Sequence, residues 1–469
     1  MSDYDLIVRG GQVFYQGELR PVDVLVKDGK VAAIEPDSVA EAAKTLDAEG
    51  KIVLPGIIDP HVHMQIKQQD KYPTADDFTT GTRSAAAGGV TTIIDFFESD
   101  EEGGTLMEAY RARRELADPQ VMIDYALHCN PPAEADLGAE IEALIEAGVT
   151  SFKLFQVYGR LALSDAQLYE DLEVIARQGA LAMLHAENGQ VVDLLVDRIK
   201  AAGGIAPIEH ARSRPPFVEA ACIATAAAFT QAVDGQLYIV HLSTADGLRQ
   251  VEMAQAAGAR ILAETCTHYL MLDESSLEGE QGMLFMCAPP LRKPHHQAAL
   301  WDGLADGHIQ TGATDHCSFN RGQKLEAPSF YQAPGGLGTV ELLLPILYSQ
   351  GVAAGRFDLA RLVEILCENT ADIFGLSPRK GRIQPGADAD LVIFDPQAEW
   401  VVHSDQLHSA SDYNVYEGLK LRGQVQTTVA RGQVVYHQGE VHADPGRGMF
   451  LPCRIPDRAD LERIIPARS

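Results

Sequence analysis

The feature that most constrains the fold is a series of eight short apolar runs, each followed by a segment with helical spacing. The runs cover residues 52–59, 90–95, 121–128, 150–155, 180–185, 237–241, 260–264 and 309–315. Strands buried on both faces have continuous apolar sequences, and strands that alternate with helices form parallel sheets. The series therefore predicts an α/β fold of the (β/α)8 (TIM-like) barrel class. An open doubly wound sheet is the alternative, but eight units in about 320 residues favour closure.

Both ends of the chain have a different pattern, with short strand-like runs between glycine turns. These runs cover residues 6–9, 23–27 and 31–34 at the start, and 389–394, 425–430 and 434–437 at the end. They predict one small β-sandwich domain formed from both termini. Two independent β modules are the alternative, which about 50 N-terminal residues could barely support. The expected division is 1–54 and 376–469 for the sandwich and its tail, and 55–375 for the barrel.

Composition excludes several classes of partner. The formal net charge of −28 disfavours nucleic acid and anionic membranes, because both repel an acidic surface. No apolar stretch reaches the roughly 18 residues of a membrane span, and the acidic first residues do not resemble a signal peptide. The seven cysteines are scattered and form no CxxC, which is typical of reduced thiols. We therefore expect a cytoplasmic protein that acts on a small molecule.

Polar residues stand at the ends of several predicted strands, where barrel enzymes carry their chemistry. His61 and His63 follow the first run, and residues at positions i and i+2 of a strand share a face, so both can bind one ion. Lys153 lies in the fourth run. His185, His241 and Asp315 end the fifth, sixth and eighth runs.

Each of these residues also has a purely structural explanation. An HxH pair occurs by chance in a chain with 15 histidines, Asp315 could cap a helix, and Lys153 could extend to the surface. The coincidence of all six at one end of one predicted barrel favours a metal site. His128 also ends a run, and spacing alone leaves its role as a ligand open.

A set of motifs then connects the chain to a known family. The motifs are PGIIDPHVHMQ at 55–65, GGVTTIID at 88–95, SFKLF at 151–155, HAEN at 185–188, YIVHLS at 238–243, ETC at 264–266, PPLR at 289–292, TDHC at 314–317 and RKG at 379–381. With these motifs the chain resembles the amidohydrolase superfamily and, within it, the D-hydantoinase/dihydropyrimidinase family. The likeness runs nearly from end to end.

The resemblance implies a metal-dependent cyclic amidohydrolase that opens the ring amide of 5-substituted hydantoins or dihydropyrimidines through a metal-bridging hydroxide. Two divalent ions are implied, Zn²⁺ first, with Mn²⁺ or Co²⁺ also suited to these ligands. His61, His63 and Asp315 would hold one ion, and His185 and His241 the other. Lys153 would be carboxylated by CO2 to N6-carboxylysine and lie between them. Carboxylation is needed because an ammonium has no lone pair to offer a cation.

The resemblance also assigns catalytic and substrate-binding residues. Asp315 would act as general base and then acid, and Tyr158 would donate to the oxyanion. Ala288 and Gly335 would contact the substrate ring through backbone groups, although the family often has Ser and Asn there. The pair Thr267-His268 replaces a common Pro-Gln and has no functional explanation from sequence.

Further positions indicate the substrate. Gln65 is typical of dihydropyrimidinases and hydantoinases, whereas dihydroorotases have Arg and allantoinases often Asn there. The loops expected to face the exocyclic substituent carry Met64, Ile66, Phe96, Phe97 and Arg160. Because this set is mostly apolar, it predicts tolerance of bulky 5-substituents. The competing hypotheses are an allantoinase or other ureide hydrolase, and a non-catalytic dihydropyrimidinase-related scaffold. A homotetramer is the assembly that the family implies.

Overall fold

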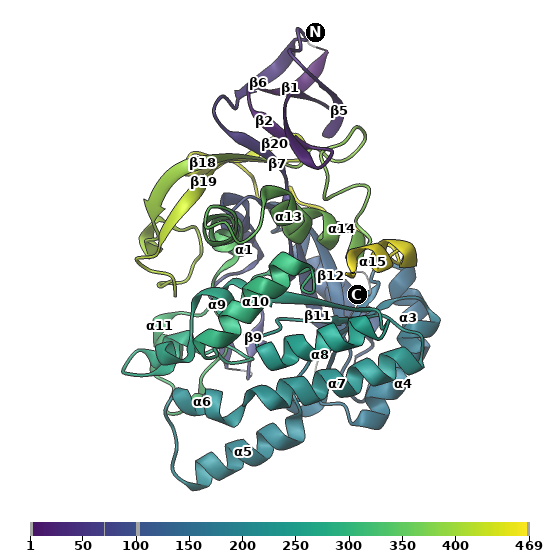
Figure 1. Ribbon diagram of the computed structural model, residues 1–469, viewed down its shortest axis with the longest axis vertical. Coiled ribbons are helices and arrows are strands. Elements are labelled where there is room, and N and C mark those ends of the chain that lie inside the picture. Colours follow the sequence, from purple (N-terminus) through teal and green to yellow (C-terminus); the bar gives the residue numbers. More distant parts are fainter. Residues whose placement is uncertain (1–2, 70, 100–103, 467–469) are drawn as a thin grey trace.

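The computed structural model describes residues 3–69, 71–99 and 104–466 (Figure 1). Its centre is an eight-stranded parallel sheet in the order β17-β16-β15-β14-β13-β12-β11-β8. The strands are β8 (Ile57–Val62), β11 (Val90–Glu98), β12 (Asp124–Asn130), β13 (Ser151–Phe155), β14 (Leu181–His185), β15 (Leu237–Ile239), β16 (Ile261–Cys266) and β17 (Thr311–Ala313). Val62 of the edge strand β8 forms a bridge with His316, three residues after the end of the other edge strand β17, and this nearly closes the sheet. The predicted (β/α)8 barrel is confirmed.

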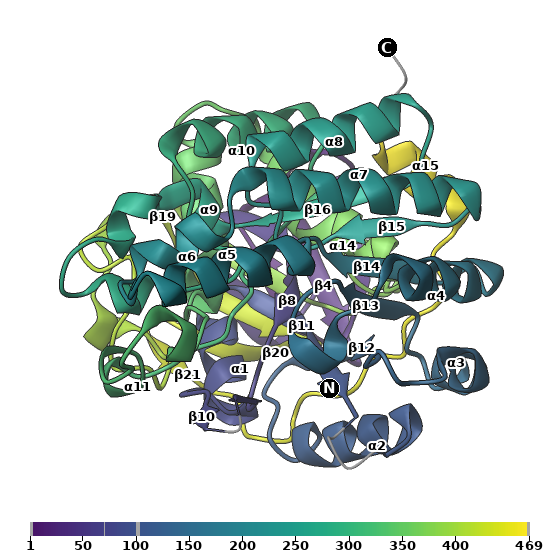
Figure 2. The same ribbon diagram turned by 90° about the horizontal axis from the view of Figure 1, so that it is seen from below.

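Helices surround the strands, as Figure 2 shows from below. The longer ones are α1 (Phe78–Ala87), α2 (Leu106–Ala117), α3 (Leu137–Glu146), α4 (Asp165–Arg177), α5 (Gly189–Ala201), α7 (Pro216–Ala232), α8 (Ala245–Ala256) and α10 (Pro294–Asp306). Capping boxes at Asp77, Thr105 and Ser164 begin α1, α2 and α4, and each satisfies backbone N–H groups that the first turn leaves free. Helices such as α3, α4 and α7 stand where segments with helical spacing follow the apolar runs, as the sequence predicted.

Shorter helices complete the barrel. They are α6 (Ile208–Ser213), α9 (Thr267–Met271), α11 (Arg321–Leu325), α12 (Leu343–Leu347), α13 (Leu359–Val363) and α14 (Asn369–Ile373). No helix among the residues that the structure describes is long and apolar enough to cross a membrane.

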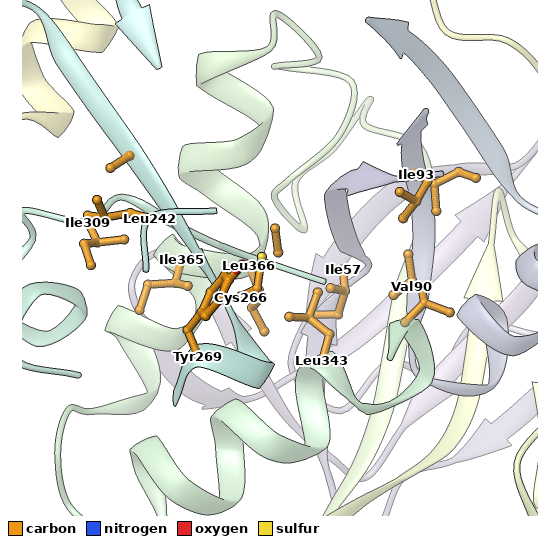
Figure 3. Close-up of a cluster of buried hydrophobic side chains, with 14 of the residues drawn as sticks. Ile57, Val90, Ile93, Leu242, Cys266, Tyr269, Ile309, Leu343, Ile365 and Leu366 are labelled. Carbon is orange, nitrogen blue, oxygen red and sulfur yellow. The ribbon is translucent and has the colours of Figure 1, made fainter. Parts of the chain in front are cut away.

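Two apolar cores hold the barrel together because successive strand residues point to opposite faces. Ile57 and Ile93 point outward and belong to the core between strands and helices, which also contains Leu343 and Leu366 (Figure 3). A second cluster includes Ile58, Ile94, Met183, Tyr238 and Leu262 from the barrel strands. All of these side chains are fully buried. The strands therefore read as continuous apolar runs because both faces are covered.

Strands from both ends of the chain form two further sheets, beside each other at the top of Figure 1. One has the order β5-β4-β1-β6 and the other β21-β20-β19-β18-β7-β2-β3. Their strands are β1 (Tyr4–Arg9), β2 (Gln12–Tyr15), β3 (Glu18–Pro21), β4 (Asp23–Lys27), β5 (Lys30–Glu35), β6 (Ala42–Asp47), β7 (Ile52–Pro55), β18 (Leu391–Val401), β19 (Lys420–Ala430), β20 (Gln433–His437) and β21 (Glu440–Val441). The expected small β domain from both termini is confirmed, whereas its residue boundaries stay a prediction.

The first predicted run was wrong in one respect, because residues 52–59 form two strands in different sheets. β7 pairs with β18 in the terminal domain, and β8 enters the barrel after Gly56. A Cβ at Gly56 would lie 2.2 Å from Thr91 Oγ1 and 2.8 Å from Asp390 Cβ, so only glycine fits. Apolar content alone does not show this break, because both strands are buried.

The loop after β18 returns to the barrel and supports its C-terminal end. Asp76, just before α1, accepts hydrogen bonds from Ser409 Oγ at 2.5 Å and from the Ala410 N–H at 2.8 Å. Tyr416 donates to Thr267 Oγ1 at 2.9 Å. Thr267 therefore joins the two domains, which explains part of the unusual Thr267-His268 pair. We have no physical explanation for His268.

Candidate metal centre

The C-terminal ends of β8 and β17 bring three predicted ligands together. Asp315 Oδ1 lies 3.3 Å from His61 Nε2 and 3.2 Å from His63 Nε2. One ligand atom from each of the three residues lies within 4.8 Å of the other two. His61 is fully buried, whereas His63 and Asp315 are partly exposed to the cavity. The ligand atoms of these three residues are close enough to one another to bind one metal ion.

Lys153 and two more histidines lie beside this group. Lys153 Nζ is 2.9 Å from His61 Nε2 and 4.3 Å from the centre of the Phe96 ring. His185 Nδ1 and His241 Nε2 are 2.9 Å apart. The His61 and His241 rings have centroids 5.4 Å apart, so the two groups of ligands are neighbours. All six predicted metal-site residues therefore converge at one place.

Two buried carboxylates lie behind the imidazoles. Glu264 hydrogen-bonds His61 Nδ1 and accepts the backbone N–H of His241 at 3.0 Å. Glu187 Oε2 lies 2.7 Å from His185 Nε2. Because an ionised carboxylate only accepts, the ring nitrogen that faces it carries the proton. The opposite nitrogen of each ring keeps its lone pair and faces the cluster, as in carboxylate–histidine–metal arrangements.

Burial and neighbouring charges shift the pKa values of the residues in this site. Burial lowers the pKa of Lys153 to about 8 and holds the pKa of His61 well below its usual value. Burial alone would raise the pKa of Asp315, but His61 and His63 outweigh it and hold that pKa well below its usual range. Burial also raises the pKa of Glu264 to about 7. The cluster thus combines an ionised Asp315 with a neutral His61 imidazole.

This donor set fits divalent metal ions. Imidazole nitrogens and a carboxylate oxygen are the ligands that Zn²⁺, Mn²⁺ and Co²⁺ accept. His241 Nδ1 is buried and has no hydrogen-bond partner among the described residues, whereas Nε2 of the same ring lies 2.9 Å from His185 Nδ1. A bound cation would also favour the ionised form of Glu264. The residues present therefore fit the metal-dependent chemistry that the sequence indicates.

Tyr158 lies at the edge of the cluster and is 38% exposed. Its ring centroid is 5.0 Å from that of His185, and the Arg214 guanidinium carbon lies 5.4 Å from the ring centre. Tyr158, His241 and Asp315 have backbone φ angles of 77°, 39° and 47°. Positive φ angles are unfavourable for residues other than glycine and concentrate at functional sites.

A cavity of about 1050 Å³ opens over the cluster. Predicted site residues that line it are His63, Phe96, Lys153, Tyr158, His185, His241, Ala288, Asp315 and Gly335. His61 lies beneath them. Met64 does not line the cavity, contrary to its prediction as a substrate contact. Its side chain is fully buried against α1, where a Cβ on Gly81 would lie 2.2 Å from the Met64 sulfur.

His128 is not available as a ligand. Its Nδ1 lies 2.6 Å from Ser151 Oγ and its Nε2 lies 3.0 Å from the Pro60 carbonyl oxygen. Both ring nitrogens are therefore occupied, which resolves the question that spacing left open. Cys317 lines the cavity as a buried free thiol, as do the other six cysteines in their own buried positions.

Sequence reasoning from strand ends missed the residues that support the ligands. Glu187 lies two residues after His185 and Glu264 lies in β16, and both stand in motifs that carried the family resemblance. Arg214 forms a buried ion pair with Glu187. A buried carboxylate in a barrel strand is the signal that could have found Glu264, because a buried charge needs a partner.

Comparison with known proteins agrees with this geometry. The model of the amidohydrolase family matches residues 52–435. A D-hydantoinase of Ralstonia pickettii is 38% identical over 96% of this chain and 99% of its own length. A crystal structure of D-hydantoinase superposes with a TM-score of 0.93 at 38% identity, over 96% of this chain and 99% of that one. The structure of a dihydropyrimidinase from Brevibacillus agri superposes with a TM-score of 0.93 at 36% identity, over the same shares of the two chains.

The matches extend over both the barrel and the terminal strands. None of the relatives named above is an allantoinase or a non-catalytic scaffold, so the two competing hypotheses are not favoured. The chain therefore belongs to the amidohydrolase family, in its hydantoinase and dihydropyrimidinase branch.

Proposed function

We propose that the chain is a metal-dependent hydrolase that opens the ring amide of 5-substituted hydantoins or dihydropyrimidines. The observation that supports this most strongly is the convergence of His61, His63, Lys153, His185, His241 and Asp315 on one cavity. The names of the relatives agree with this substrate class.

Two groups of residues would hold the metal. His61, His63 and Asp315 form one group, and His185 with His241 forms the other. Zn²⁺ is the first candidate ion, and Mn²⁺ or Co²⁺ would also suit these ligands. When bound, such ions would activate a water and polarise the ring carbonyl.

Lys153 belongs to the site as a carbamate in this proposal. Its amine lies 2.9 Å from His61 Nε2, where an unmodified ammonium could offer no lone pair to a cation. Addition of CO2 to the neutral amine releases one proton and gives an anion with two oxygens. Those oxygens could bind the metal ions that the two groups of ligands would hold.

The remaining steps use groups of this chain. Asp315 would take a proton from the attacking water and deliver it to the leaving ring nitrogen. Tyr158 would donate its hydroxyl proton in a hydrogen bond to the oxygen that gains charge. The carbon–nitrogen bond breaks, the carbon keeps the hydroxyl group, and the nitrogen gains the proton.

Ala288 and Gly335 line the cavity, so they could bind the ring through backbone groups. Gln68 donates to the Gly335 carbonyl at 2.7 Å and accepts the Gly335 N–H at 3.0 Å. This contact fixes the backbone at a position where the family often has Asn. The apolar side chains of Ile66, Phe96 and Phe97 favour aryl or alkyl substituents at position 5.

A substrate panel tests the proposed function. Dihydrouracil, hydantoin, 5-phenylhydantoin, allantoin and dihydroorotate would be assayed with metal analysis on the same preparation. We expect ring opening of the first three, with kcat/KM for 5-phenylhydantoin at least equal to that for dihydrouracil. A strong preference for dihydrouracil would contradict the tolerance of bulky substituents. Activity on allantoin alone would overturn the assignment.

We also propose a cytoplasmic homotetramer. The seven cysteines are buried free thiols, which supports a reducing compartment. Light scattering of the purified protein measures the assembly directly, and a monomeric mass would contradict it.

A further inference from the structure

One polar side chain in the cavity has no assigned role. Asn130 is the last residue of β12 and is only 7% exposed, yet it lines the cavity. Neither atom of its side-chain amide has a hydrogen-bond partner among the described residues, and Oδ1 is fully buried. Since buried polar groups are nearly always satisfied, an unpaired amide in a cavity indicates a missing ligand group.

The strand register places this amide beside the metal centre. Phe96 pairs with His128 and Glu98 with Asn130, while Cys129 pairs with Phe152 on the other side. Asn130 therefore lies next to Lys153 across β12 and β13. The His128 ring contacts the Phe96 ring in the barrel interior, with centroids 4.8 Å apart, and Asn130 shares its face two residues further on.

The chemistry of the Asn130 amide indicates a neutral ligand group. Phe96, Phe97, Phe155 and Leu161 line the same cavity with apolar side chains, and Glu98, the strand neighbour of Asn130, adds an acidic side chain that disfavours an anionic ligand. Ligand sites are typically apolar with a few placed polar groups, and those groups set specificity. An amide carries no charge, and its two atoms can act as donor or acceptor. Since nothing fixes its orientation, it can bind a carbonyl oxygen or an N–H group.

The position of β12 in the barrel indicates which part of the substrate it meets. In the strand order, β12 stands opposite β16, and Ala288 and Gly335 follow β16 and β17. If the substrate ring rests on those two backbones, its substituted edge faces β11, β12 and β13. This step rests on the proposed function.

We propose that Asn130 is a specificity residue that hydrogen-bonds a neutral polar group, of the carboxamide type, on the 5-substituent of the substrate. An apolar substituent of equal size fits the same space but leaves the amide unpaired. Because sites with a buried polar group discriminate against ligands that lack its partner, the enzyme should favour the carboxamide.

Two hydantoins of equal shape test this proposal. One carries a 2-carbamoylethyl group at position 5 and the other a 3-methylbutyl group. The Asn130→Leu variant keeps the side-chain size and removes the hydrogen bonds. We expect it to lower kcat/KM for the carboxamide substrate about tenfold and to leave the alkyl substrate unchanged or faster. Asn130→Ser, which retains a donor and an acceptor, should recover part of the preference.

Three results would overturn the proposal. They are an equal loss for both substrates, which marks a structural role, no change for either, and a wild-type preference for the alkyl compound. If the wild-type protein opened neither ring, the proposed function would fail instead. Calorimetric binding of the same two hydantoins to wild type and Asn130→Leu would then test the contact directly, with equal affinities contradicting it.

Discussion

Two parts of the barrel rim, one of six strands and one of two, differ in how their side chains are held. On β13 to β17 and β8, charged or imidazole groups are tied to buried partners, as His61 is to Glu264 and His185 to Glu187. On β11 and β12, the rim presents Phe96 and Phe97 together with Glu98 and the unpaired amide of Asn130. The first part, which we call the charged part, has its metal-site side chains held by hydrogen bonds before any ligand binds. The second part offers an apolar surface with few polar contacts. We infer that chemistry belongs to the first and choice of substituent to the second.

The largest expected effect comes from the charged part. Asp315→Asn removes a proposed metal ligand and the proposed general base together, and we expect kcat for ring opening to fall by about 10⁴-fold. Metal content should fall as well. Retention of more than a tenth of the activity would contradict the assignment of Asp315 and with it the division of the rim.

Tyr158→Phe should have the next largest effect. Loss of one donor to a developing oxyanion costs about 10²–10³ in kcat. Steady-state kinetics would measure it, and KM and metal content should change little. Tyr169→Phe is a matched control, because Tyr169 is 37% exposed but lies on α4 and does not line the cavity. Equal effects of the two changes would refute the role of Tyr158.

Glu264→Gln tests whether the fixed orientation of His61 matters. We expect roughly 10- to 100-fold weaker metal binding, because an imidazole loses the carboxylate that orients it. Titrating the metal-free variant with metal and measuring the activity regained at each concentration would show the weaker binding. Glu219→Gln is the control, since Glu219 is equally buried but bonds Ser243 and Thr244. If both variants bound metal like the wild type, metal binding by the charged part would not depend on its buried carboxylates.

Asp76→Asn should have the smallest effect on kcat and a distinct effect on stability. Burial would raise the pKa of Asp76, but His316 and the hydrogen bonds from Ala410 and Ser409 hold it below its usual value. Its stabilising contribution is therefore present above the unfolded pKa of about 3.9 and lost as pH falls below it. Denaturant unfolding should show wild type losing more stability than the variant between pH 5 and pH 3. Equal losses of stability in the wild type and the variant would contradict this prediction.

Much of the fold could be predicted because it rests on burial. The eight apolar runs correspond to barrel strands, because strands covered on both faces are continuously apolar and show no alternation of polar and apolar residues. The misread run at 52–59 shows the limit, because the break at Gly56 is set by Thr91 and Asp390, which are distant in sequence. No local pattern contains that contact.

The site was predictable to a different degree in each part of the rim. Ligands follow strand ends, so His61, His185 and Asp315 could be found from position and residue type. Met64 was assigned to the loops that face the exocyclic substituent, yet its side chain is buried against α1. Asn130 was missed because an asparagine at a strand end usually serves a turn, and only the structure shows that its amide is unpaired.

The most direct measurement is the metal content of the purified protein together with hydantoin ring opening, before and after chelation. The proposed site predicts two divalent ions per chain, loss of activity on chelation, and recovery when Zn²⁺, Mn²⁺ or Co²⁺ is returned. Fewer than one ion per chain, with ring opening undiminished after chelation, would contradict it.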